Sequence, residues 1–334
     1  MSDEIACARR GTAAMPNARS PHAGRALAIA AAIVAALFAA ILPFFAATFA
    51  VTLATEIMIF GIFASGINLL LGTTGLVSLG QAMFLGLGGY GIGVGSSLLG
   101  LPLWLSIPST LVAVGAVSAI VGSICTRTRG VEFLLITLAF SQMMYGAAIK
   151  LRITGGSDGM SGIPRPDLSA VGLSADDPAT FYYYVLSATA VLLFGLWRIV
   201  KSPFGSVLEG IRENERRMAA MDYAVGFYKV GAFSFGAIVC AAAGILQAQY
   251  TYFINPDSMS WQLSGEGVLM VIIGGASSVL GPLVGAAIFV LVKQGLSSLT
   301  GDYLMFFGLF FMLVVAFFRG GVFGALRILL GTRK

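Results

Sequence analysis

Few side chains in this sequence are of the types that most often carry out catalysis. The single histidine, His22, lies in a polar N-terminal stretch, so histidine-based catalysis inside the apolar blocks is excluded. The three cysteines, Cys7, Cys125 and Cys240, are far apart and show no CxxC or metal-ligand spacing. We therefore expect no metal site. Cys125 and Cys240 lie at or within apolar blocks, and we expect them to be buried free thiols.

A glycine-rich stretch superficially resembles a phosphate-binding loop. It begins with Thr154, Gly155, Gly156, Ser157 and Asp158. It lacks the lysine of GxxxxGK[ST], and no Gly-Lys pair occurs in the chain, so there is no Walker A motif. We expect no cofactor in this chain. The stretch fits either a rigid surface loop or a structured turn that caps a pathway or touches an external partner.

Three glutamates lie within or beside apolar blocks, where ionisable groups are candidates for function. Glu132 follows Arg127 and Arg129 at the edge of a block, which favours a local ion pair. Glu266 lies near the start of its block, where it would be partly hydrated. Glu56 is the deepest of the three, and we treat it as a candidate for a role in transport.

Residues 72–99 combine many glycines with a few hydroxyl and amide groups, at Ser78, Gln81 and Tyr90, and Asn68 lies just before them. Backbone left unpaired within a membrane must be buried in protein or must line a wet cavity. The pattern therefore fits a bent or broken helix beside a translocation pathway. The alternative is tight helix packing, with Asn68 and Gln81 bonding between helices.

Composition places these residues in a helical membrane protein. The chain is 57% hydrophobic and 10% charged, with a mean hydropathy of +0.91, whereas soluble domains average about a quarter charged residues. We predict an all-α, polytopic fold of about ten transmembrane segments, at residues 26–45, 49–71, 72–99, 103–125, 131–149, 181–200, 230–249, 265–280, 282–299 and 303–318. Glycine-rich segments after the second and the seventh span also fit an inverted repeat.

The basic residues orient these segments, since lysine and arginine concentrate in cytoplasmic loops. All lysines and arginines fall on one side except Lys150, Arg152 and Arg165 on the other side and Lys293 in a span. Both termini are then cytoplasmic, and the first span is expected to stay uncleaved. We divide the chain into an N-terminal tail (1–25), a permease domain (26–318) and a C-terminal tail (319–334). The net charge of +5 is spread over short loops, which favours membrane lipid over nucleic acid.

Residues 201–229 form the longest charged insert between two apolar blocks, and they predict a helix at the cytoplasmic membrane surface. Ser202 would cap this helix, and Pro203 would be its first residue. One face carries an apolar stripe of Val207, Ile211, Met218, Met221 and Val225. The other face carries Glu209, Arg212, Glu213 and Arg216, and Glu213 is spaced to pair with Arg216 or Arg217. The helix is either simply solvated or docks a soluble partner.

Four blocks of sequence resemble the LivM-type permeases, the membrane subunits of ABC importers for branched-chain amino acids. They are GINLLLGTTGLVSLGQAMFLGLGGY (66–90), TGGSDGMSGIPRP (154–166), SPFGSVLEGIRENERRMAAMDY (202–223) and GEGVLMVIIGGASSVLGPLVGA (265–286). The blocks occur in the family's order, and the resemblance spans roughly residues 61–321. Asp222 departs from the glycine expected near this position, and no family role carries over to Glu56.

The resemblance implies an importer of the cell inner membrane. Its parts would be a LivH-like permease partner, two cytoplasmic ABC ATPases of the LivG and LivF type that bind the ATP, and a periplasmic substrate-binding protein. The segment 202–223 would be the coupling loop that contacts an ATPase. Its implied contact residues are Val207, Glu209, Ile211, Arg212, Glu213, Asn214, Arg216, Met218 and Met221.

Two other functions are weighed against this one. An ion-coupled secondary transporter would need acidic side chains within the spans, and Glu56 beside the glycine-rich segment is the strongest candidate in the sequence. An intramembrane enzyme would gather His, Asp or Cys near one face, and the only histidine is in the tail. The sequence alone does not define the substrate, since related importers carry urea, amides or other amino acids.

Overall fold

The computed structural model describes residues 47–166, 177–276 and 278–299, together with a few isolated positions. The chain divides into two compact units, residues 1–45 with Lys334, and residues 46–333. The description below concerns the second unit. The predicted spans at 26–45 and 303–318 and both predicted tails fall outside the continuously described ranges.

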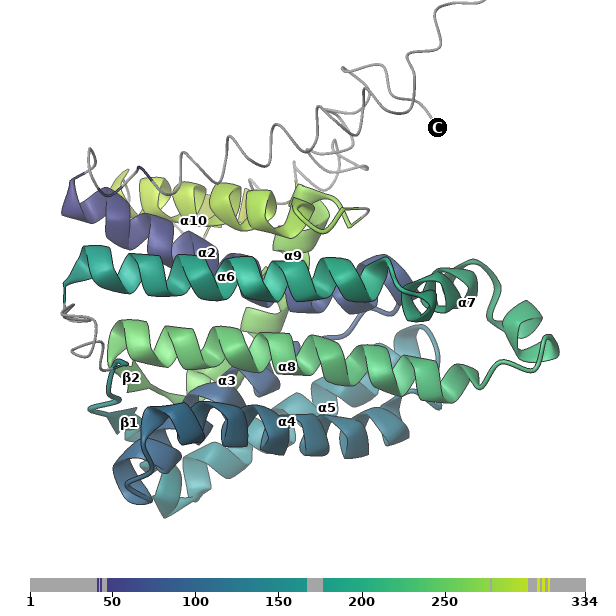
Figure 1. Ribbon diagram of the computed structural model, residues 1–334, viewed down its shortest axis with the longest axis horizontal. Helices are drawn as coiled ribbons and strands as arrows, with labels where there is room; N and C mark the ends of the chain where they lie inside the picture. The colour runs from purple at the N-terminus through teal and green to yellow at the C-terminus, as the bar shows by residue number, and fades with distance from the viewer. Residues whose placement is uncertain are drawn as a thin grey trace, which may run out of the picture. The chain divides into compact units, whose positions relative to one another are not determined.

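The described part is almost entirely helical (Figure 1). Its helices are α2 (Thr48–Thr74), α3 (Gln81–Gly93), α4 (Leu103–Cys125), α5 (Val131–Lys150), α6 (Pro178–Val200), α7 (Pro203–Ala220), α8 (Val225–Thr251), α9 (Trp261–Gly274) and α10 (Gly281–Leu299). A π-helical turn, Val94–Leu98, continues α3. Short 3₁₀ turns lie at Arg152–Thr154, Gly156–Asp158 and Pro256–Met259. Two short strands, β1 (Met160–Ser161) and β2 (Phe253–Ile254), pair antiparallel.

Six helices in the described ranges are long and apolar enough to cross a membrane: α2, α4, α5, α6, α8 and α10. α9 is apolar but shorter. The helical membrane fold predicted from composition is confirmed. The number of ten spans remains a prediction.

α2 and α8 form the centre of the unit. Each has 27 residues and is largely buried, and α8 packs against α2, α3 and α4. Glycines permit these contacts: a Cβ on Gly244 would lie 1.8 Å from the Leu85 carbonyl oxygen, and one on Gly88 would lie 2.1 Å from that of Ala241. Close backbone approach through small residues is typical of helices packed in membranes.

Residues 72–99 contain the helix break that their glycine density predicts. α2 continues to Thr74 and ends at Gly75, whose φ of 73° is left-handed. The chain then turns, and α3 begins at Gln81 in the buried interior. Here the amide of Ala82 donates to Ser264 Oγ at 2.9 Å, so the first turns of α3 and α9 meet.

Candidate functional site

The segment 201–229 is not one continuous helix. α7 begins at Pro203, as predicted, but Ser202 does not cap it, because its hydroxyl donates to the Ile199 carbonyl at 2.7 Å. Inside α7, Asn214 leaves the helical conformation, with φ −157° and ψ 95°. Asn214 Oδ1 accepts a hydrogen bond from the Arg217 amide at 3.0 Å, as a capping residue does at a new helix start.

A turn follows α7 and reverses the chain into α8. Asp222 in this turn has φ 64°, in the left-handed region that glycine adopts most easily. This conformation explains why a glycine is expected near this position, and aspartate is one of the few other residues that enter it. Val225 and Lys229 therefore belong to α8 and not to the surface helix.

Much of the predicted apolar stripe packs within this chain. Leu208 and Ile211 are buried against Ala232 of α8, and Ile211 is only 4% exposed. Partly buried hydrophobic residues surround this cluster: Phe204, Val207, Met218, Val225 and Tyr228. Ile211 thus fixes α7 on the bundle and does not belong to an exposed surface.

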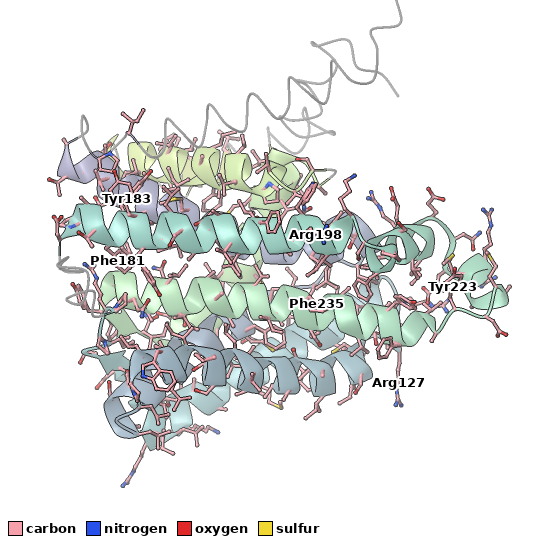
Figure 2. The ribbon with its side chains drawn as sticks, viewed as in Figure 1. Arg127, Phe181, Tyr183, Arg198, Tyr223 and Phe235 are labelled. Atoms are coloured by element: carbon pink, nitrogen blue, oxygen red, sulfur yellow. The ribbon has the colours of Figure 1, made fainter. Side chains whose placement is uncertain are left out.

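The exposed apolar residues lie instead at the turn. Met221 is 60% exposed, Tyr223 40% and Phe227 75%, and we call these three residues the tip. Helix α7 and the turn project at one end of the bundle, and Figure 2 labels Tyr223 there. The exposed charged residues of α7 are Glu209, Arg212, Glu213, Arg216 and Arg217. Exposed aromatic residues, methionine and arginine are enriched in protein interfaces, so these side chains suit a protein contact.

Glu215, for which the sequence predicted no role, anchors the second half of α7. Its carboxylate lies 2.6 Å from Lys229 Nζ and 3.2 Å from Arg129 Nη2. The Lys229 side chain is only 2% exposed. Among the described residues, the expected pairs of Glu213 with Arg216 or Arg217 do not form, because the bend at Asn214 interrupts their spacing. Arg129 pairs with Glu215 and not with Glu132.

The first half of α7 reaches the end of α2. Arg212 Nη1 donates a hydrogen bond to the Gly72 carbonyl oxygen. A Cβ on Gly75, the left-handed residue that ends α2, would lie 3.3 Å from Arg212 Cγ. α7 is therefore attached to α8, to the loop before α5 and to the end of α2.

The candidate pathway residues do not converge on one lining in this subunit. Asn68 is 8% exposed, and its Nδ2 donates to the Ser278 carbonyl at 3.1 Å. It borders a cavity of about 20 Å³ together with Ser65, Leu69, Thr73, Leu196, Val200 and Val279. A cavity of that size has room for about one water molecule. Tyr90, 4% exposed, lies elsewhere, in an apolar cluster with Ile245 and Ile254.

Ser78 and Gln81 are both buried, Ser78 in the turn between α2 and α3 and Gln81 at the start of α3 against α8. The Gly80 amide donates to Ser78 Oγ at 3.2 Å. Gln81 is fully buried, and its Oε1 accepts from the Cys240 thiol at 3.6 Å. Gln81 Nε2 has no hydrogen-bond partner among the described residues. The bond between Cys240 and Gln81 joins α8 to α3, which is the kind of contact expected in the alternative of tight helix packing.

Glu56 belongs to a charged group on three helices. It interacts electrostatically with Lys293 of α10, and Lys293 Nζ lies 3.7 Å from Glu266 Oε2 of α9. The Lys293 and Glu266 side chains are 40% and 28% exposed. The sequence located all three residues in apolar blocks, but it did not show that they come together.

The glycine-rich loop at residues 154–159 forms a structured turn. Thr154 Oγ1 donates to the Ala148 carbonyl at 2.6 Å, and Ser157 Oγ donates to Asp158 Oδ1 at 3.2 Å. Gly155 and Gly156 have φ of 76° and 65°. The turn leads into β1, which pairs with β2 at the end of the bundle opposite α7 (Figure 1).

Comparison with known proteins supplies the remaining evidence. The family model described as "Branched-chain amino acid transport system / permease component" matches residues 49–318. The high-affinity branched-chain amino acid transport system permease protein LivM of Escherichia coli K12 is 29% identical over 287 residues, 79% of this chain and 67% of that protein.

Two further relatives are similar over most of the chain. LivM of Salmonella typhimurium is 27% identical over 264 residues, 72% of this chain and 62% of that protein. The autoinducer 2 import system permease protein LsrD of Photorhabdus luminescens is 27% identical over 282 residues, 73% of this chain and 81% of that protein. The chain thus spans about two thirds of the length of the two LivM proteins. No solved structure was found to match.

Proposed function

Since this chain belongs to the family of branched-chain amino acid transport system permease components, we propose that it is the membrane permease subunit of an ABC importer. It moves branched-chain amino acids, or related small polar solutes, across the cell inner membrane. Separate ATPase subunits bind and hydrolyse the ATP, and this chain catalyses no reaction of its own. A second, LivH-like permease and a periplasmic substrate-binding protein complete the assembly.

The exposed tip of the α7 segment is the single observation that carries the assignment of an ATPase contact. Met221, Tyr223 and Phe227 present apolar surface beside exposed arginines and glutamates. The distribution of lysine and arginine supports a cytoplasmic location for this segment, on the side where ATPases would bind, and the same location for both termini. LivG- and LivF-like ATPases would dock on this tip.

Transport by alternating access is supported by paired broken segments. α2 and α8 each have 27 residues, and each is followed by a left-handed residue and then by a helix of about half the length, α3 with 13 residues and α9 with 14. Two such units of opposite orientation make up an inverted repeat, the architecture of many transporters. In this proposal ATP-driven movement of α7 passes into the two units, within a fold of ten spans.

The substrate class rests on the relatives. Two of them are named for branched-chain amino acid transport and one for import of autoinducer 2. The candidate pathway residues Asn68, Ser78, Gln81 and Tyr90 are sparse and uncharged, which suits passage of a zwitterion better than tight binding of an ion. Selectivity then belongs mainly to the binding protein.

An ion-coupled secondary transporter is the second candidate, and the charged group of Glu56, Glu266 and Lys293 favours it. Ionisable groups among membrane helices are common where ions or protons are coupled to transport. In the ABC assignment these residues serve packing or contact with the second permease.

Reconstitution tests the two functions against each other. The chain is co-purified with LivG- and LivF-like ATPases and a LivH-like permease, incorporated into proteoliposomes, and supplied with a binding protein and labelled leucine. We expect uptake that requires ATP and is indifferent to ion gradients. Uptake that proceeds without nucleotide and stops when the ion gradient is dissipated would establish the secondary transporter instead. Competition by unlabelled amino acids and by other small solutes defines the substrate class.

A further inference from the structure

Two arginines bind the ends of the two long central helices. Arg212 Nη1 donates to the Gly72 carbonyl of α2. Arg165 Nε donates to the Gln249 carbonyl of α8 at 3.0 Å, and its Nη2 donates to the Tyr250 carbonyl at 3.1 Å. Since α2 ends at Thr74 and α8 at Thr251, Gly72 and Gln249 occupy the same position, two residues before the last.

This position suits a guanidinium group for a general reason. The last carbonyls of a helix have no intrahelical donor, and the helix dipole makes this end negative. An arginine there satisfies an unpaired acceptor and the dipole together. Charge-assisted bonds of this kind are stronger than neutral ones, so each arginine is a firm attachment.

Both helix ends are also the points where the chain breaks. Gly75 after α2 has φ 73°, and Tyr252 after α8 has φ 56°. The half-length helices α3 and α9 follow these breaks. Arg165 additionally lies over two aromatic rings, with Cζ 4.1 Å from the Phe181 ring centroid and 4.3 Å from that of Tyr252. Each arginine therefore holds the junction between a long helix and a short one.

The two arginines come from surface segments at opposite ends of the bundle. Arg212 belongs to α7, whose exposed tip is at one end. Arg165 follows β1, and β1 lies at the other end (Figure 1), where Figure 2 labels Phe181. Each arginine therefore contacts its helix break through hydrogen bonds, and not through packing alone.

We propose that Arg212 and Arg165 are positioning residues that link surface segments to helix breaks. Arg212 links α7 to the break between α2 and α3. Arg165 links the loop that contains β1, here called the outer loop, to the break between α8 and α9. Movement of α7 then shifts the α2–α3 junction directly. Movement of the outer loop shifts the α8–α9 junction. This role rests on the proposed function, but the attachment itself is a property of the isolated chain.

Hydrogen exchange on the purified full chain in detergent tests the attachment without any partner. Arg212→Gln should speed exchange of the amides at 76–80 by about tenfold, with no effect at 252–255. Arg165→Gln should do the reverse. Arg198→Gln, which removes an exposed charge on α6 without touching either break, is the control. Equal loosening of both breaks by either variant, or no change at the variant's own break, would overturn the proposal.

The second measurement asks whether the link transmits movement. In the reconstituted complex, ATP hydrolysis and solute uptake are measured on the same proteoliposomes. Arg212→Gln should lower the amount of solute taken up per ATP hydrolysed about tenfold, and Arg212→Lys should restore part of that ratio. Parallel loss of hydrolysis and uptake, or unchanged uptake per ATP, contradicts transmission through Arg212. Failure of the wild-type complex to take up solute with ATP would contradict the proposed function instead.

Discussion

Single glycines decide how closely the central helices approach. At Gly244 the α8 backbone meets the α3 backbone so closely that an added Cβ would lie 1.8 Å from the Leu85 carbonyl oxygen. Backbone atoms cannot turn away as a flexible side chain can. The two helices must therefore separate to admit even one methyl group.

We predict that Gly244→Ala lowers the free energy of unfolding by about 1–3 kcal/mol or more, the usual cost of overpacking. Thermal unfolding of the detergent-solubilised chain measures the change. Gly195→Ala on α6 is the matched control, since a Cβ there meets nothing within 4 Å. Equal unfolding temperatures for the two variants would refute the role of Gly244 in this contact.

The ion pair of Glu215 with Lys229 is a second contribution of single residues to the stability of the fold. Lys229 is almost fully buried, and its ammonium group lies 2.6 Å from the Glu215 carboxylate, which is its ion-pair partner. We predict that Glu215→Gln costs about 1–3 kcal/mol of unfolding free energy, less than for a fully buried pair because Glu215 is 23% exposed. Denaturation in detergent gives the value.

Two further variants separate the pair from a general charge effect. Glu213→Gln removes an exposed acid with no ion pair among the described residues, and it should change stability by less than about 0.5 kcal/mol. The double variant Glu215→Gln with Lys229→Met removes both charges and should recover most of the loss. A double variant as unstable as Glu215→Gln alone would show that the buried charge is not the cause.

Helix α7 shows, at the scale of elements, what the sequence could and could not predict. Pro203 correctly predicted where the helix starts. The helical periodicity of the apolar and charged faces correctly predicted a surface helix. Periodicity does not tell whether an apolar face is covered by the same chain or by a partner, so the burial of Ile211 was not foreseen. The bend at Asn214 was missed because one asparagine can either continue a helix or cap a new one.

The broken segment at residues 72–99 shows the same limit. Glycine density predicted the break, since glycine permits both the left-handed turn at Gly75 and close packing. Whether Gln81 faces a pathway or a neighbouring helix depends on α8, which is distant in sequence. Similarly, Glu56 and Lys293 were each located in spans, but only the folded chain brings them together.

The tip, where α7 turns into α8, supplies a prediction at this scale. Phe227 is 75% exposed, and Ile211 is 4% exposed. We predict that Phe227→Asp weakens binding of the ATPase subunits by about thirtyfold, which corresponds to loss of an interface hot spot of about 2 kcal/mol. The chain itself should fold as before. Affinity is measured by titrating purified ATPase onto the detergent-solubilised chain.

Ile211→Asp gives the contrasting result. It inserts a charge into the cluster that α7 forms with Ala232 of α8, so it should lower the unfolding temperature of the isolated chain. Phe227→Asp should leave that temperature within error. If Phe227→Asp binds the ATPase normally, the tip is not the docking surface.

At the scale of the whole molecule, composition and charge carry most of the inference. Repeated apolar blocks predicted a polytopic helical protein, and six span-length apolar helices in the described ranges agree with it. The α7 tip and the β1–β2 pair lie at opposite ends of the helices (Figure 1). We therefore expect these two ends to face opposite sides of the membrane, and the bias of lysine and arginine favours the cytoplasm for the α7 end.

Labelling of single cysteines tests that assignment. In a Cys7→Ala background, where the remaining Cys125 and Cys240 are buried, Ser157→Cys puts a thiol in the external loop and Ala219→Cys puts one beside the tip. A membrane-impermeant maleimide added to intact cells should label only Ser157→Cys, and inside-out vesicles should give the reverse. Labelling of Ala219→Cys in intact cells would reverse the orientation, and a cytoplasmic ATPase could then not reach the tip.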